Sequence, residues 1–186
     1  MLKHKNTLEL SNAAFVIIDV QEAFRESIPN FEEITKNIVI FVEGSKLLNV
    51  PVIVTEQYPK GLKHTAREIL DTLPQDAEVI EKTAFSSCGA QTFNEKLAQL
   101  NRTQIIVAGI EAHICVNQTV HDLLEDDFQV HLLSDCISSR EKSNKKIAIN
   151  KMQASGAIMT SVEMALFEMM RDAKHEQFKA IQKLIK

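Results

Sequence analysis

A carboxylate, an amine and a thiol stand at the ends of short apolar runs in this sequence. Asp19 follows "FVII", Lys82 follows "VIE", and Cys115 follows the run "IIVAGI" and a short polar turn. Cys115 is predicted in the first turn of a helix, where unpaired N–H groups and the helix dipole favour an anion and lower the pKa of a thiol. A carboxylate can accept the thiol proton and an amine can stabilise the charge, which together suit acyl transfer through a thioester.

Each of the three residues also has a simpler interpretation. A free cysteine is usually a small buried residue. Asp19 could cap the following turn, and Lys82 could extend to solvent. A carboxylate that ends an apolar strand is costly unless it meets water, donors or a cation, and Lys82 could be that cation. The catalytic interpretation gains weight because all three residues are expected at the same sheet edge.

The elements that carry these residues alternate between short apolar segments and longer amphipathic ones. This alternation predicts βαβ units with a parallel sheet, and runs that are apolar on both faces predict helices on both sides. The expected fold class is α/β, a three-layer α/β/α sandwich with a six-stranded parallel sheet. Ligands bind such sheets beyond the carboxyl ends of the strands. The predicted strands cover residues 14–19, 51–56, 78–82, 104–110, 129–135 and 156–161.

Length and composition restrict the class of protein. A chain of 186 residues can bury a full core as one domain, so we expect a single domain over 1–186, with a helical extension at about 162–186. A net charge of -4 with 45% hydrophobic residues is typical of a soluble globular protein and argues against a nucleic-acid partner. The apolar stretches are too short to cross a membrane, and the N-terminus has no apolar signal region, so a cytoplasmic location is expected. Three cysteines, an odd number, are interpreted as thiols.

Three blocks of the sequence resemble a known family. The segments "VIIDVQEAF", "EKTAFSS" and "VAGIEAHICVNQTV" resemble, in this order, motifs of the isochorismatase-like cysteine hydrolases. The resemblance extends over about residues 13–165. The segment "VTEQYPKGL" looks most like the isochorismatase domain-containing subgroup.

The resemblance implies a Rossmann-like hydrolase fold and a mechanism. It makes Asp19, Lys82 and Cys115 a catalytic triad and implies a cis peptide between Ile110 and Glu111. The N–H groups of Glu111 and Cys115 would then form an oxyanion hole. Family members that cleave a vinyl ether lack the nucleophilic cysteine, so the resemblance favours an amide hydrolase that cleaves a C–N bond.

Four residues that follow strand ends are candidates for the substrate pocket. The aromatic residues Phe24, Tyr58 and Phe85 could line an apolar recess, although each could instead belong to the core. Gln21 could position Asp19 or Lys82, or it could bond a loop backbone.

The sequence predicts no metal and no cofactor. Nicotinamidase relatives hold zinc or iron with an Asp and His cluster after the second strand. Here that segment reads "TEQYPKGLKHTA", in which Glu56 and His64 alone do not make a ligand set. His121 lies six positions beyond Cys115, too far along a helix to reach the sulfur. His113 is expected to face solvent or the pocket rim.

Two further classes of protein compete with the hydrolase. One is a catalytically idle domain that binds proteins through its amphipathic C-terminal segment, although the intact triad argues against idleness. The spacing of apolar residues in this segment is equally consistent with packing onto its own sheet, and these residues are Phe167, Met170, Phe178, Ile181 and Ile185. The other is a nucleotide-binding domain, which is disfavoured because only five glycines occur and no G-x-G-x-x-G or Walker pattern follows a strand. The expected partners are a small-molecule substrate and further copies of the chain in a homo-oligomer, as in many relatives, with no nucleic acid and no membrane.

Overall fold

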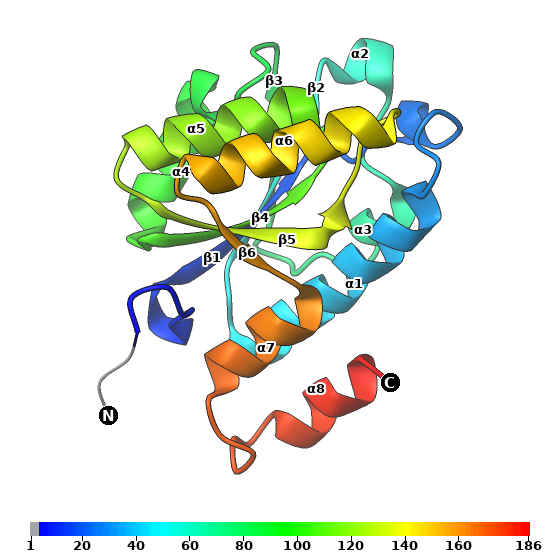
Figure 1. Cartoon of the computed structure of the whole chain (residues 1–186). Coiled ribbons are helices and arrows are strands. Elements are labelled where there is room, and N and C mark those ends of the chain that lie inside the picture. Colours follow the sequence, from blue (N-terminus) through cyan, green and yellow to red (C-terminus); the bar gives the residue numbers. More distant parts are fainter. Residues whose placement is uncertain (1–3) are drawn as a thin grey trace.

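A six-stranded parallel sheet forms the centre of the protein. The computed structural model describes residues 4–186 (Figure 1). The strand order is β3-β2-β1-β4-β5-β6, and all neighbouring strands are parallel. The predicted α/β fold and its six strands are confirmed, with ends that differ from the prediction by no more than two residues. The strands are β1 (Ala13–Ile18), β2 (Val52–Gln57), β3 (Glu78–Lys82), β4 (Gln104–Gly109), β5 (Gln129–Ile137) and β6 (Ile158–Thr160).

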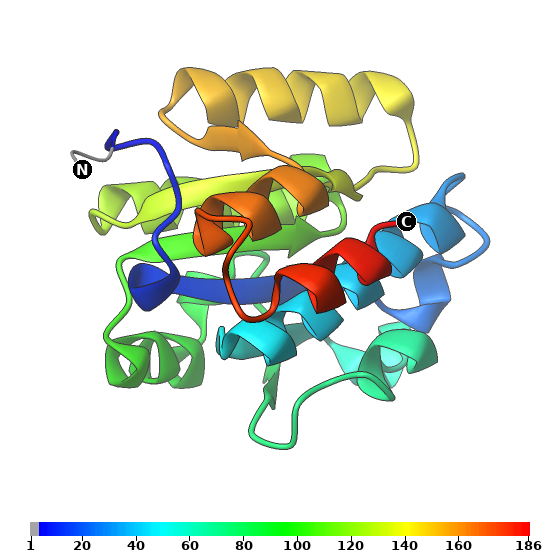
Figure 2. The same ribbon diagram turned by 90° about the horizontal axis from the view of Figure 1, so that it is seen from below.

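Helices cover both faces of the sheet. Helices α1 (Phe31–Leu48), α3 (Arg67–Leu70), α7 (Val162–Met170) and α8 (Phe178–Leu184) contribute to the core on one face. The other face packs against α4 (Gln91–Leu100), α5 (Asn117–Glu125) and α6 (Lys142–Ala154). The view from below shows the orange and red helices α7 and α8 crossing the near side of the sheet (Figure 2). No helix within residues 4–186 is both long and apolar enough to cross a membrane.

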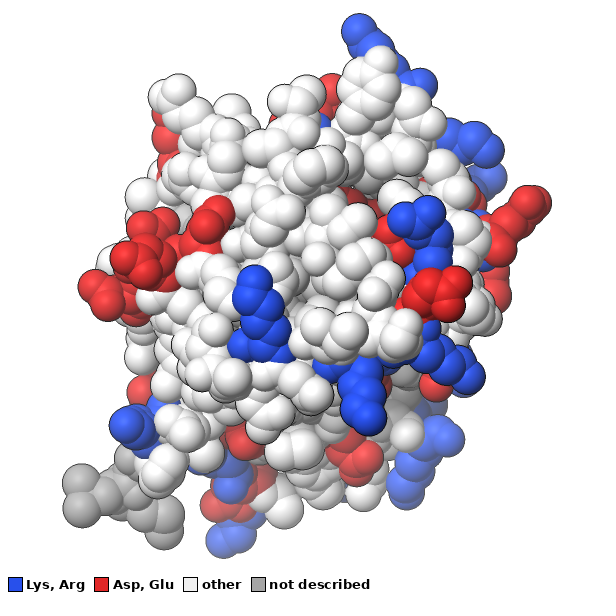
Figure 3. All heavy atoms as spheres, turned by 45° about the horizontal axis from the view of Figure 1, so that its top comes forward, with Lys and Arg blue, Asp and Glu red and all other residues white. Residues whose placement is uncertain are grey.

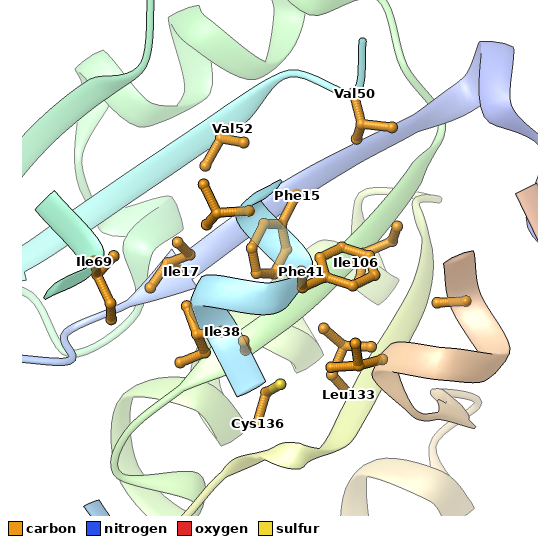
Figure 4. Packing of buried hydrophobic residues seen from close by; sticks show 14 of the residues in the cluster. Phe15, Ile17, Ile38, Phe41, Val50, Val52, Ile69, Ile106, Leu133 and Cys136 are labelled. Carbon is orange, nitrogen blue, oxygen red and sulfur yellow. The ribbon is translucent and has the colours of Figure 1, made fainter. Parts of the chain in front are cut away.

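Strand β1 is buried along its whole length, which explains why its sequence is apolar without alternation. Phe15 and Ile17 point to the layer that contains α1, while Val16 points to the opposite layer. Phe15 meets Phe41 of α1 edge to face, with ring centroids 4.7 Å apart (Figure 4). This packing on both faces fixes the direction of β1, and therefore the position of Asp19 at its end.

The C-terminal segment forms two separate helices, α7 and α8, rather than one continuous helix. Helix α7 ends at Met170, and Arg171 then adopts a left-handed conformation with φ of 64°. The Arg171 guanidinium donates to the carbonyl of Leu8 at 2.7 Å, which ties the turn to the N-terminal segment. Ile181 of α8 is fully buried among residues of α1 and α7. The apolar side of this segment therefore packs on its own domain, as one of the two sequence interpretations expected.

A histidine is buried in the middle of β5. The His131 side chain is 0% exposed, and its Nε2 lies 3.2 Å from Gln129 Oε1. Its Nδ1 has no hydrogen-bond partner in the part of the chain that the structure describes. Burial lowers the pKa of His131 to about 4.

We predict that His131 makes the fold sensitive to acid. Between pH 6.5 and about 4, His131 is protonated in the unfolded chain but stays neutral in the folded chain. The free energy of unfolding therefore decreases as the pH falls through this range. This difference in the pKa of His131 lowers the free energy of unfolding by up to about 3 kcal/mol. Denaturant unfolding at several pH values should show a smaller decrease for His131→Leu than for wild type. The exposed His4→Gln should behave as wild type; equal pH dependence of all three proteins would contradict the prediction.

Candidate active site

Asp19 lies at the carboxyl end of β1, in the turn that leaves the sheet. Its φ is 54°, a left-handed conformation that Asp tolerates better than most residues. The Asp19 N–H donates to the carbonyl of Thr55 at 3.1 Å, and the Asp19 carbonyl accepts from the Gln21 N–H at 2.8 Å. The carboxylate is therefore held at the sheet edge, where it is 1% exposed.

Lys82, at the end of β3, forms a buried ion pair with Asp19. Its Nζ lies 2.6 Å from Asp19 Oδ2, and the side chains are 0% and 1% exposed. Lys82 does not extend to solvent, so that simpler interpretation is wrong. Its ammonium also donates to Gln57 Oε1 at 2.8 Å and to the carbonyls of Phe85 and Ala84 at 2.9 and 3.2 Å. These acceptors compensate for the loss of hydration that burial imposes on the charge.

Cys115 lies beside Asp19, but its setting differs from the prediction. It belongs to a π-helical turn, Ala112–Val116, that precedes α5, rather than to the first turn of α5 itself. The expected low pKa is also wrong: burial raises the pKa of the Cys115 thiol, and the charge of Asp19 raises it further, while Lys82 opposes them only in part. Burial outweighs the helix dipole here because the sulfur is almost withdrawn from solvent.

The Asp19 carboxyl has the properties of a base for this thiol. Burial raises its pKa, while Lys82 and hydrogen bonds from Cys115 and Thr55 oppose the increase. The Thr55 hydroxyl donates to Asp19 Oδ1 at 2.8 Å, so both carboxylate oxygens are engaged. The site thus pairs an un-ionised thiol with a carboxylate that binds protons more readily than an exposed one.

The chain between β4 and the π-helical turn passes very close to β1. Gly109 has φ of 140°, and a Cβ at this position would lie 2.2 Å from the Ile18 carbonyl oxygen. Only glycine fits there. The peptide bond between Ile110 and Glu111 is cis. Within residues 4–186 the Glu111 N–H forms no hydrogen bond, which leaves it available as a donor.

The Glu111 side chain is anchored from another loop. The side chain is only 4% exposed, and its carboxylate accepts a hydrogen bond from the Arg140 backbone N–H at 2.9 Å. Arg140 Nε lies 3.1 Å from each Glu111 carboxylate oxygen. The Ala112 N–H donates to the Ser138 carbonyl at 2.7 Å. The segment after β5 therefore supports the turn that contains Glu111.

A small cavity of about 90 Å³ opens onto the sulfur and the carboxylate. Two of the predicted pocket residues, Phe24 and Phe85, line it, together with residues that the sequence did not indicate. The lining consists of Asp19, Phe24, Gln57, Leu62, Phe85, Ile110, Glu111, Ile114 and Cys115.

The other two predicted pocket residues lie outside this cavity. Tyr58 is 55% exposed and lines a second recess of about 490 Å³ that also includes Lys82 and Thr83. Gln21 is fully buried and bonds loop backbone: its amide nitrogen donates to the carbonyls of Gln57 and Lys63, at 3.0 and 2.7 Å. Gln21 thereby holds the end of β2, where Gln57, a partner of Lys82, is located.

Neither Glu56 nor the histidines form a metal cluster. Glu56 accepts from the Thr65 N–H at 2.6 Å and lies 3.0 Å from His64 Nδ1, so it fixes the following loop. Residues 4–186 contain no group of three or more His, Cys, Asp or Glu side chains placed to hold a metal ion. His113 lies 3.0 Å from Ser139 Oγ, and His121 lies 2.6 Å from the Asn117 carbonyl oxygen.

Sequence reasoning missed a buried series of hydroxyl groups behind the site. Thr55, beside Asp19, lies 3.5 Å from Ser87 Oγ, and Ser87 Oγ lies 3.4 Å from Thr119 Oγ1. Thr119 donates to the Cys115 carbonyl at 2.8 Å. The series therefore connects the carboxylate with the turn that carries the thiol. The one local signal was the hydroxyl of Thr55 within an otherwise apolar run.

This parallel α/β sandwich, with a thiol and an ion pair at the carboxyl edge of its sheet, is an isochorismatase-like hydrolase fold. The isochorismatase domain matches residues 13–164, and the chain belongs to this family. It is 35% identical over 183 residues to isochorismatase family protein 1A of Dictyostelium discoideum, covering 97% of this chain and 89% of that protein. It is 34% identical over 181 residues to isochorismatase domain-containing protein 2 of Danio rerio, covering 96% and 89%.

A solved relative has the same architecture. The structure of MAR1 ribonuclease from Caenorhabditis elegans superposes with a TM-score of 0.92 at 36% identity, covering 96% of this chain and 92% of that one. The family resemblance stated from the sequence motifs is therefore confirmed.

We predict that Asp19→Asn lowers the pKa of the Cys115 thiol relative to wild type. The substitution removes a negative charge that raises this pKa and leaves Lys82 nearby. The ultraviolet absorbance of the thiolate, followed against pH, measures the change, and Cys115→Ser supplies the background from Cys88 and Cys136. Thr55→Val removes a hydrogen bond but keeps the Asp19 charge, so it should shift the titration less. An unchanged or increased pKa in Asp19→Asn would contradict the assigned cause.

Proposed function

We propose that the protein is a cysteine hydrolase that cleaves the C–N bond of a small amide through a thioester on Cys115. The observation that carries the proposal is the contact of a buried thiol with the ion-paired Asp19 at the wall of a cavity. Membership of the isochorismatase family supports a hydrolase.

The first half of the reaction forms the thioester. Asp19 accepts the Cys115 proton as the sulfur attacks the amide carbonyl, and the C=O electron pair moves to the oxygen. The N–H groups of Glu111 and Cys115 stabilise this oxyanion. When the electron pair returns, the C–N bond breaks and Asp19 passes its proton to the departing amine.

The second half releases the acid. Asp19 accepts a proton from a water molecule, whose oxygen attacks the thioester carbonyl. The C–S bond then breaks, and the proton returns to the sulfur. Throughout, Lys82 stabilises the ionised form of Asp19. The raised pKa of the thiol fits this sequence of steps, because a thiol that does not ionise alone needs a base in contact with it.

Cleavage of RNA is a second candidate, because the 36% identical Caenorhabditis elegans relative is named as a ribonuclease. A polyanion requires an extended basic surface. The face that carries α2 (Pro59–Leu62), α5 and α6 shows scattered basic side chains, acidic ones among them, and a broad uncharged middle (Figure 3). The net charge is -4. The absence of an extended basic surface on this face and the negative net charge favour a small amide over RNA as the substrate. Self-association of the chain and a cytoplasmic location stay predictions.

We expect Cys115→Ala to abolish ammonia release from small primary amides. Loss of the nucleophile removes the covalent route, so kcat/KM should fall by at least about 10³-fold. Cys88→Ala is the matched control: it removes a half-buried thiol outside the site and should keep wild-type activity. Mass spectrometry of the wild-type protein quenched during turnover should detect an acyl group on Cys115.

Two outcomes would contradict this function. Equal rates for wild type and Cys115→Ala would favour the catalytically idle domain. Degradation of RNA that is lost in Cys115→Ala, without cleavage of any amide, would favour the ribonuclease.

Arg140 is a positioning residue in this proposal. Arg140→Ala leaves the buried Glu111 without its cation, so the turn that holds the oxyanion donors relaxes and kcat should fall by roughly 10- to 100-fold, with a smaller change in KM. Arg140→Lys restores the charge without the two-point contact and should recover part of kcat. Arg67→Ala, which removes an exposed arginine outside the site, should leave both constants unchanged. A change in KM alone for Arg140→Ala would contradict this role.

A further inference from the structure

We infer that the acyl group accepted by this site is short, uncharged and apolar. The inference rests on the proposed function, because it names the substrate class for the same cavity. It is carried by the size of the cavity, by the apolar character of its wall and by the occupation of every polar side chain there.

The size of the cavity restricts the substrate first. Its volume of about 90 Å³ is well below the roughly 300–1,000 Å³ of pockets for larger ligands. This suits the acyl part of a short-chain amide.

The wall of the cavity is mainly apolar. Its five apolar residues come from different parts of the chain, and none of the nine lining residues is a Lys, Arg or His. A charged group that enters such a space loses its hydration without gaining a counter-ion. The apolar residues are Phe24, Leu62, Phe85, Ile110 and Ile114.

The polar side chains in the wall are already bonded to the protein. Asp19 accepts from Thr55 with one oxygen and from Lys82 with the other. The Gln57 amide accepts from Lys82 through Oε1 and donates to the Thr83 carbonyl at 2.8 Å.

The second carboxylate in the wall, that of Glu111, also has a cationic partner, because both of its oxygens accept hydrogen bonds from Arg140. The thiol and the N–H groups of Glu111 and Cys115 remain, and in the proposed mechanism all three interact with the reacting carbonyl. The site therefore recognises the carbonyl and has no side chain left to bind a charged substituent.

An amide series of similar size tests the inference. Propionamide is neutral, glycinamide is a cation and malonamate is an anion, and their chains are short. We expect kcat/KM for propionamide to exceed that for each charged amide by at least about 10-fold, since a buried unpaired charge is strongly disfavoured. Benzamide should also be a poorer substrate than propionamide, because its ring needs more of a space of only about 90 Å³.

A second measurement does not depend on turnover. Iodoacetamide and iodoacetate differ in charge but share the iodide leaving group. In each, the Cys115 thiol gives its proton to Asp19 and the sulfur displaces iodide as the S–C bond forms. Mass spectrometry gives the rate at Cys115, which is divided by the rate with free cysteine. The normalised rate should be at least about 10-fold higher for iodoacetamide.

A variant with a new cation checks that charge is the cause. Leu62→Lys places an ammonium group at the half-buried wall position in α2, so it should raise the normalised rate of iodoacetate relative to iodoacetamide. Leu62→Met keeps the wall apolar and should retain the wild-type preference.

The outcomes separate this inference from the proposed function. Normalised rates that are equal for the two reagents, or malonamate as the best substrate, would overturn the inference while the hydrolase proposal stands. Strong discrimination against iodoacetate without turnover of any amide would support the neutral cavity and contradict the amide hydrolase.

Discussion

The buried ion pair between Asp19 and Lys82 is the interaction on which the rest of the site depends. A pair that is 2.6 Å apart and at most 1% exposed must recover a large loss of hydration. The recovery comes from Thr55, Gln57 and two backbone carbonyls that also bond to the charges. Well-packed apolar residues would often stabilise a fold as well as such a pair does. Its presence at a cavity therefore favours a chemical role over a purely structural one.

The same pair determines how the thiol can act. Burial raises the pKa of the Cys115 thiol, the charge of Asp19 raises it further, and Lys82, which is already paired with Asp19, opposes them only in part. In the proposed mechanism, the nucleophile therefore forms by proton transfer to Asp19 during the attack. The helix dipole, on which the sequence argument relied, has little effect on a sulfur that lies in the π-helical turn before α5 and is nearly withdrawn from water.

The features that could be predicted from the sequence are those that depend on local residue patterns. Short β-branched runs marked the six strands, and parallel strands place Asp19 and Lys82 at one edge wherever their ends fall. Contacts between residues of the site that are far apart in the sequence were not predicted. Arg140 meets Glu111 from 29 positions away, and Ser87 meets Thr119 from 32 positions away, without any local signal for either contact. The direction of the thiol pKa was wrong for the same reason, since burial results from the whole fold.

In the proposed hydrolase, different residues are responsible for catalysis and for selectivity, because the polar groups of the site are already bonded to one another. The charged residues are bonded to one another and to the backbone, so they need no part of the substrate beyond its carbonyl. Selectivity in the proposed hydrolase then belongs to the apolar wall, which includes Phe24, Leu62, Phe85 and Ile114. Substitutions among these four residues can alter the accepted acyl group without disturbing the Asp19–Lys82 pair, because none of their side chains bonds to it. In the proposed mechanism, one arrangement of thiol, carboxylate and ammonium can thus serve different small substrates.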